Sequence, residues 1–375
     1  MEKIYLDNAA TTALRPEVAA EMMEILQNEY GNPSSSHSFG RTAKSKLELS
    51  RKTIAQFLNV SAQEIIFTSG ATEANNWILQ NAVVNLNIKR IITSKIEHHA
   101  VLHAVEFLQR KYEIQVDFVK VKSGGSIDIN NLMELLSKEI PTLVSLMHVN
   151  NETGTILDLE EIAKICKQHS VYFHSDTVQS VGKMELDLQQ IPLDFMVASA
   201  HKFHGPKGVG FAFIRKGLSL KPIFHGGEQE KGIRPGTESL HNIVGMAKAL
   251  QVSYQNLDAE RNCIQELKEY TISQLQNKFP DMAFNGATQK TLYTILNVRL
   301  PLDASKSGML LFNLDMKGIA VSRGSACQSG SARPSHVLAA FLDEKEVLQP
   351  SIRISFSHLN TKKEIDVLIE ALLAL

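Results

Sequence analysis

Short apolar runs rich in β-branched residues alternate with longer amphipathic stretches from about residue 50 to residue 215. This alternation is typical of βαβ units, in which strands and helices follow one another along the chain. Some runs, such as 143–147, are almost continuously apolar, which indicates a sheet covered on both faces. We expect strands at 64–68, 90–93, 116–121, 142–148, 171–174, 195–198 and 209–214.

Polar clusters follow several of these predicted strands directly. They lie at 69–72, 150–152, 175–176 and 201–202. Ligands of parallel α/β sheets gather at the carboxyl ends of the strands. The pattern therefore predicts one site built from segments far apart in the sequence.

The pattern changes after residue 238. A long helical stretch at 242–277 precedes fewer strands, which we expect at 292–298, 319–322 and 352–356. We expect a large α/β domain at 15–250, and a small α+β domain formed by 1–14 and 251–375, with a mobile loop at about 322–333. The glycine-rich stretch 226–232 is predicted to be an exposed loop.

Composition places the chain among soluble two-domain proteins. Its 375 residues are too many for one ordinary core, and 43% are hydrophobic and 21% charged. The 39 basic and 40 acidic residues show no basic stripe, so we expect no direct nucleic-acid binding. We find no apolar run of the ~18 residues that a membrane helix requires, and no signal-peptide profile. Three cysteines favour a reducing, cytoplasmic location over a disulfide framework.

Lys202 is the first candidate for chemistry. It follows the apolar run 195–198 and precedes the turn at Gly205 and Pro206. A lysine held at the end of a buried strand is partly desolvated, which lowers its pKa and frees the amine to attack an aldehyde. Such a lysine can hold pyridoxal 5'-phosphate as a Schiff base. The segment alone fits a surface lysine in a polar loop equally well.

The segment 69–76 follows a predicted strand and opens a helix with small residues. Small residues let backbone amides approach an anion, and the helix N-terminus adds partial positive charge. Thr72 adds a hydroxyl donor. This arrangement predicts a phosphate cradle without a Walker lysine. An ordinary capped helix start is the alternative.

Other polar residues suit a flat heteroaromatic cofactor. Asp176 follows the strand at 171–174 and could pair with a protonated pyridine nitrogen. Gln179 and Asn151 could donate to the ring's phenolic oxygen, and a neutral His98 could stack on the ring. Asp176 could instead cap a helix. A metal site at the histidines is the other alternative, but no Cys-x-x-Cys and no His-x-x-x-His with a paired glutamate supports it.

Cys327 lies among small, flexible residues in the segment 321–332. Such a segment cannot pack a core, so we expect it to be mobile and accessible. Arg323 or a histidine nearby could lower the pKa of the thiol. Cys166 and Cys263 lie in half-apolar helical contexts and are expected to be structural. Cys327 could also be a tolerated loop cysteine.

Together these segments resemble the class I, NifS/IscS-like cysteine desulfurases, a group of fold-type I pyridoxal-phosphate enzymes. Nine motifs carry the resemblance in order across nearly the whole chain. They are 6–12 (LDNAATT), 31–34 (GNPS), 70–76 (GATEANN), 97–98 (EH), 148–152 (HVNNE), Asp176 with Gln179, 200–202 (AHK), 234–237 (RPGT) and 324–327 (GSAC).

The resemblance implies a fold and a reaction. The fold would be a mostly parallel seven-stranded sheet domain with a smaller α+β domain. The reaction would convert L-cysteine to L-alanine and leave the sulfur on Cys327 as a persulfide. A mobile loop would then pass the sulfur to an acceptor protein, such as an iron–sulfur scaffold or a tRNA-thiolation protein.

The resemblance also assigns site residues. The implied catalytic residues are Lys202, Cys327 and His98, and the implied dimer is a homodimer in which Thr237 comes from the second subunit. Arg353 would clamp the substrate carboxylate, with Asn8 and Asn32 lining the pocket. No resident metal is implied, although an iron–sulfur contact through Cys327 is left open. Cofactor binding would fall to Ala71, Thr72, His98, Asn151, Asp176, Gln179, Ser199, His201, Lys202 and Thr237.

Two positions depart from the family pattern. Arg323 stands where serine is common, and Gln328 stands where threonine is common. We expect Arg323 to favour the thiolate, although it could instead alter acceptor docking. The alternatives to a desulfurase are a selenocysteine lyase, a small aminotransferase with an incidental Cys327, and a non-catalytic sulfur-relay protein.

Overall fold

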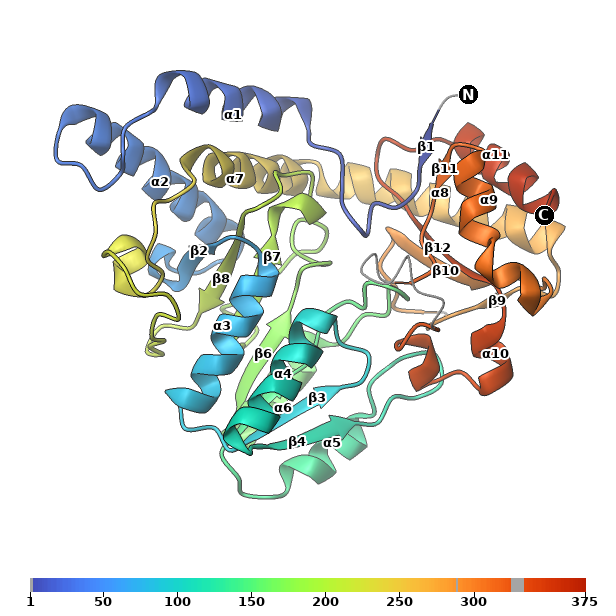
Figure 1. Ribbon diagram of the computed structural model, residues 1–375, viewed down its shortest axis with the longest axis horizontal. Helices are drawn as coiled ribbons and strands as arrows, with labels where there is room; N and C mark the ends of the chain where they lie inside the picture. Colours follow the sequence, from blue (N-terminus) through green and yellow to red (C-terminus); the bar gives the residue numbers. More distant parts are fainter. Residues whose placement is uncertain (1–2, 288, 325–333) are drawn as a thin grey trace.

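The computed structural model describes residues 3–287, 289–324 and 334–375. Its largest sheet has seven strands in the order β2-β8-β7-β6-β5-β3-β4 (Figure 1). Each strand overlaps a predicted one, so the expected seven-stranded α/β fold is confirmed. The strands are β2 (Ile65–Thr68), β3 (Arg90–Ser94), β4 (Gln115–Val119), β5 (Thr142–Ser145), β6 (Tyr172–Asp176), β7 (Phe195–Ser199) and β8 (Gly210–Ile214).

Strand direction explains where a site can form. Strand β8 is antiparallel to both of its neighbours, β2 and β7, and every other pairing in the sheet is parallel. Strands β2, β3, β5, β6 and β7 therefore run in the same direction. Their carboxyl ends share one edge of the sheet.

Strand β5 is shorter than predicted. It ends at Ser145, whereas the apolar run suggested pairing as far as residue 148. Beyond β5 the amides of Leu146 and His148 still donate to β6 carbonyls, at 3.2 and 3.0 Å, but the amide of Met147 between them donates to the Glu97 carboxylate at 2.8 Å. Regular pairing with β3 thus ends early, while the chain stays beside β6 as far as His148 and contributes to the carboxyl edge.

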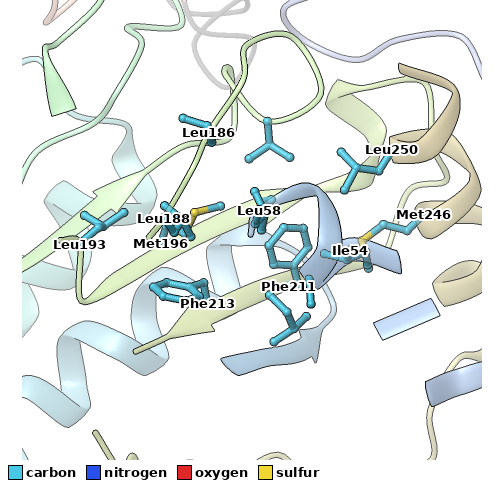
Figure 2. Packing of buried hydrophobic residues seen from close by; sticks show 14 of the residues in the cluster. Ile54, Leu58, Leu186, Leu188, Leu193, Met196, Phe211, Phe213, Met246 and Leu250 are labelled. Carbon is cyan, nitrogen blue, oxygen red and sulfur yellow. The ribbon is translucent and has the colours of Figure 1, made fainter. Parts of the chain in front are cut away.

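Helices cover both faces of the large sheet. In β7, Phe195 and Val197 pack with helices α3 (Ala71–Val84) and α4 (His99–Tyr112), while Met196 and Ala198 pack into the opposite core. Figure 2 shows that opposite core, where Met196 lies among side chains from neighbouring strands and helices. This two-sided burial is what the continuous apolar runs predicted. The opposite core takes residues from α1 (Pro16–Asn28), α2 (Ser38–Phe57), α5 (Ile129–Leu136), α6 (Leu159–Gln168) and α7 (Leu240–Gln255).

A second region contains two small sheets, on the right of Figure 1. One has the order β12-β10-β9, and the other pairs β1 in parallel with β11. The amino-terminal strand thereby joins the carboxyl-terminal third of the chain. The elements are β1 (Ile4–Tyr5), β9 (Ala283–Phe284), β10 (Ile295–Arg299), β11 (Ile319–Ala320), β12 (Ser351–Ser355), α9 (Leu310–Met316), α10 (Glu344–Leu348) and α11 (Lys362–Leu373).

The helical stretch predicted at 242–277 is two helices, α7 and α8 (Leu257–Lys278), which run one after the other across the top of Figure 1. They break at Asn256, whose backbone N–H still bonds to the carbonyl of Val252. Such a small break leaves the periodicity of apolar residues almost unchanged, so the pattern could not reveal it. No helix in the described parts of the chain combines the length and apolarity needed to cross a bilayer.

The glycine-rich stretch 226–232 is only partly the exposed loop that was predicted. Glu230 within it is buried, and its carboxylate pairs with Arg51 of α2 at 2.7 Å. The same carboxylate accepts the backbone N–H of Phe67 in β2 at 3.0 Å. The stretch is therefore held against α2 and β2 through a buried ion pair.

Candidate active site

A cavity of about 250 Å³ lies at the carboxyl edge of the large sheet. Segments that follow β2, β3, β5, β6 and β7 meet here because these strands run in the same direction. The single site expected from the polar clusters therefore exists as one cavity. The predicted residues that line it are Ala71, Thr72, His98, Asn151, Asp176, Gln179, Ser199, His201, Lys202 and Arg353.

Three other predicted residues lie away from this cavity. The Asn8 amide is buried and donates to the carbonyl of Ser355 at 2.9 Å. Asn32 and Thr237 are exposed, and the Asn32 side chain accepts the backbone N–H of Ser34 at 2.9 Å. Cys327 and Gln328 lie outside the described residues.

Lys202 closes a short 3₁₀ turn, Ala200–Lys202, directly after β7. A close approach fixes this turn: a methyl group on Gly205 would lie 2.9 Å from the carbonyl oxygen of Ala200. The Lys202 Nζ donates to the carbonyls of Ala9 and Ala10, both at 2.7 Å. The amine thus points into the cavity, against the amino-terminal segment.

Asp176 is the last residue of β6 and is buried. Its Oδ2 accepts from Nδ2 of Asn75 at 2.8 Å, and its Oδ1 accepts the backbone N–H of Val178 at 3.1 Å. These two donors hold the carboxylate in one orientation. Asn75 belongs to the motif 70–76, but no role was predicted for it. The sequence feature that could have revealed it is a polar asparagine on the apolar face of a helix, between Ala74 and Trp77.

The amino terminus of α3 forms another wall. Its first backbone N–H, at Ala71, donates to Oγ of Ser199 at 2.9 Å. Gly70 before it has a φ of 150°, and a methyl group on Gly210 would lie 2.8 Å from the Gly70 Cα. Glycine at both positions lets β8 and the helix start pack together. The result places a helix amino terminus, which favours anions, at the cavity.

Two histidines of the cavity have lowered pKa values. Burial lowers the pKa of His98; Asp176 opposes the shift, and Lys202 adds to it. Its Nδ1 accepts the backbone N–H of Ala100 at 3.1 Å, which places the proton of the neutral ring on Nε2. Burial, and then the charge of Lys202, lower the pKa of His201 to about 4. Both rings are therefore neutral at pH 7.

Arg353 brings a cation into the cavity from β12 and is 1% exposed. Its Nη2 donates to Oδ1 of Asp7 at 2.7 Å, and its Nη1 donates to the carbonyl of Asn151 at 2.8 Å. Its buried Nε has no hydrogen-bond partner among the described residues. A guanidinium held in this way still has a hydrogen-bond donor and a positive charge with which to bind a further anion.

These residues fit pyridoxal 5'-phosphate. The cavity offers a lysine amine, a buried carboxylate at Asp176, a neutral imidazole at His98 and a helix amino terminus beside Ser199. The amine suits the carbonyl carbon of the cofactor, and the carboxylate suits its ring nitrogen. The imidazole suits the face of the ring, and the helix amino terminus suits the phosphate.

Comparison with known proteins gives the family. The family model described as aminotransferase class V matches residues 4–368. A cysteine desulfurase IscS of Dictyoglomus turgidum is 40% identical over 372 residues, which cover 99% of this chain and 93% of the relative. The chain belongs to the cysteine desulfurases of the class-V aminotransferase family.

Two solved structures agree with this assignment. A NifS-like protein matches the desulfurase with a TM-score of 0.91 and 36% identity, covering 100% of this chain and 99% of the other. A structure described as SspA in complex with cysteine matches with a TM-score of 0.82 and 30% identity, covering 96% and 100%. The resemblance seen in the sequence is confirmed, and the desulfurase is a pyridoxal-phosphate-dependent enzyme.

Proposed function

We propose that this enzyme converts L-cysteine to L-alanine and receives the sulfur on Cys327 as a persulfide. One observation carries the proposal. Asp176 and Lys202 lie at and just after the carboxyl ends of adjacent parallel strands, and both line one cavity that Arg353 also lines. An amine, a carboxylate and a carboxylate-binding cation are what such a reaction on an amino acid requires. The relative solved with cysteine bound gives independent support.

Each residue has a task that its surroundings suit. When bound, the cofactor withdraws electrons from the α-carbon of the amino acid. The Asp176 carboxylate would stabilise positive charge on the ring nitrogen of the bound cofactor. The amine of Lys202 takes the proton from the α-carbon and later returns it. The neutral ring of His98 would pack on the bound cofactor and can move a proton at Nε2.

Arg353 supplies the anchor for the substrate. Asp7 and Asn151 hold two of its nitrogens, so the guanidinium plane is fixed before substrate arrives. A fixed, planar cation binds a carboxylate more selectively than a flexible lysine would. We propose that it orients the α-carbon of cysteine toward Lys202.

The sulfur step moves one sulfur atom from the β-carbon of the substrate to the sulfur of Cys327. The Cys327 thiolate attacks the substrate sulfur, an S–S bond forms, and the substrate C–S bond breaks. The carbon left behind takes a proton and becomes the methyl group of alanine. The product on the enzyme is a Cys327 persulfide, so no external oxidant is needed. We expect Arg323 to favour the thiolate of Cys327.

We further propose the setting of this reaction. The enzyme acts in the cytoplasm as a homodimer in which Thr237 of the second subunit approaches the cofactor phosphate. The exposure of Thr237 on one chain is compatible with that role. The persulfide then passes to a protein acceptor for iron–sulfur cluster assembly or another thiolation.

The test compares Cys327→Ala with Cys263→Ala. Cys263 is an exposed cysteine on α8, so its substitution removes an accessible thiol away from the cavity. With L-cysteine, Cys327→Ala should lose alanine and sulfide formation while keeping the cofactor, and Cys263→Ala should keep both. Full turnover in Cys327→Ala would refute the sulfur-transfer step and favour an aminotransferase or another lyase.

A further inference from the structure

Lys183 is a buried lysine behind the wall of the cavity. It follows β6, is 9% exposed and does not line the cavity itself. The preceding Gly182 has a φ of 76°, and a methyl group there would lie 2.7 Å from Cβ of Phe203. The hydroxyl of Tyr293 donates to the Lys183 carbonyl at 3.1 Å. This packing fixes the backbone from which the lysine side chain extends.

A chain of hydrogen bonds connects Lys183 with the reacting amine. The Lys183 Nζ donates to Oε1 of Gln179 at 3.1 Å. The amide Nε2 of Gln179 donates to the carbonyl of Ala9 at 3.0 Å. The same carbonyl accepts from Lys202 at 2.7 Å. Among the described residues, Lys183 is thus linked to the cavity through Gln179, which lines it.

The charges around Lys183 are mostly positive. Burial, then Lys202 and Arg353, lower its pKa to about 7. His201 and His204, on the turn after β7, are also near enough for Lys183 to lower their pKa values.

A carboxylate lies in the same neighbourhood but is already engaged. Glu260 lines the small internal cavity that Lys183 also lines, and it pairs with Arg15 at 2.7 Å. A buried amine among cations is costly, and lysine is almost never fully buried without a pairing partner. Packing alone would be served better by methionine or leucine. A function is therefore the better account of the amine.

We propose that Lys183 is a positioning residue that fixes the orientation of the Gln179 amide. Its Nζ holds the amide oxygen on the far side of the cavity wall and directs the amide N–H₂ group to the cavity side. An amide turned the other way would present an oxygen, which cannot donate a hydrogen bond. This inference rests on the proposed function, in which Gln179 donates to the ring oxygen of the bound cofactor.

The test is a pH titration of the visible band of the cofactor bound to the enzyme. A hydrogen-bond donor at the ring oxygen and a cation nearby both lower the pKa of the nitrogen that Lys202 contributes. Lys183→Met removes both effects, so the titration midpoint should rise. The expected rise is about half a unit to one unit, a roughly three- to tenfold change in acid dissociation constant. Lys183→Arg keeps a donor and should move the midpoint less.

Two comparisons decide whether Lys183 acts through Gln179. In a Gln179→Leu background, Lys183→Met should cause a clearly smaller rise, because only the effect of the nearby charge is left to remove. Lys268→Met is the matched control, because Lys268 is also buried but donates to Thr291 and Leu292 instead. It should lower the melting temperature without moving the midpoint. Lys183→Leu serves as the second variant if Lys183→Met does not fold.

Different results would overturn the role of Lys183 and the proposed function. An unchanged midpoint in Lys183→Met, or a full additional rise in the Gln179→Leu background, would overturn the inference while the proposed function stands. A wild-type protein that develops no visible band with pyridoxal phosphate would overturn the proposed function as well.

Discussion

His98 illustrates how burial sets the protonation state of one residue. Its pKa is lowered chiefly by burial, so the ring is neutral at pH 7 and gains a proton only below about 6.5. The pH–rate profile should therefore show no loss of activity from His98 between pH 8 and 7. We expect His98→Asn to lower kcat by about 10²-fold or more, as for loss of a general acid or base. Unchanged kcat with cofactor bound would exclude a catalytic role for His98.

Single residues of the site were predictable to different degrees. Lys202 and Asp176 could be found because each lies at or just beyond the end of an apolar strand, and the strand end fixes its place. Lys183 could not be found, because a lysine in a turn gives no sign of burial until Gly182 packs against Phe203. Asn8 was expected at the substrate, but it is part of the polar contacts between the amino-terminal segment and β12.

At the scale of elements, the buried pair of Arg51 and Glu230 connects α2, β2 and the segment after residue 226. Both side chains are at most 5% exposed. Removing Glu230 leaves the buried Arg51 with the exposed Glu48 at 3.3 Å as its remaining charged partner and leaves the Phe67 N–H without its acceptor, which costs about 3 kcal/mol. Glu230→Ala should therefore lower the free energy of unfolding by about that amount.

The control for this prediction is Glu160→Ala. Glu160 pairs with Lys164 on the surface of α6, where the two side chains are 50% and 60% exposed. Exposed pairs contribute about 0.5 kcal/mol, so this variant should be nearly as stable as the wild type. Denaturant unfolding measures the free energy of unfolding of both variants. Equal losses in the two variants would contradict a special role for Glu230.

Strands and helices could be predicted where the spacing of apolar residues along the sequence was distinctive. The strands of the large sheet could be located because burial on both faces leaves continuous apolar runs. The end of β5 and the break between α7 and α8 could not, because both depend on backbone hydrogen bonds that leave the apolar pattern unchanged. The burial of Glu230 depended on a distant partner, Arg51, which no local pattern indicates.

At the scale of the whole molecule, buried histidines make the fold sensitive to acid. Burial lowers the pKa of His174 to about 3 and that of His148 to about 4. Below pH 6.5 the unfolded chain binds protons that the folded chain does not. The two neutral histidines therefore contribute fully to the free energy of unfolding above pH 6.5. This contribution is lost as the pH falls toward 4, by up to about 1.4 kcal/mol per pH unit for each histidine.

The change in the free energy of unfolding with pH is best measured between pH 6.5 and 5, for His174→Gln and the wild type in parallel. Glu97 acts in the opposite sense, because burial raises its pKa, so the difference between the two proteins is the informative quantity. His174→Gln should lose stability less steeply than the wild type as the pH falls. Equal slopes would contradict the assignment.

The most direct test of the whole account is to locate the lysine that carries the cofactor. The holoenzyme is reduced with borohydride, digested and analysed by peptide mass spectrometry. The account predicts the pyridoxyl group on the peptide that contains Lys202 and none in Lys202→Ala. A label on another lysine, Lys183 included, or no label on the wild type, would contradict it.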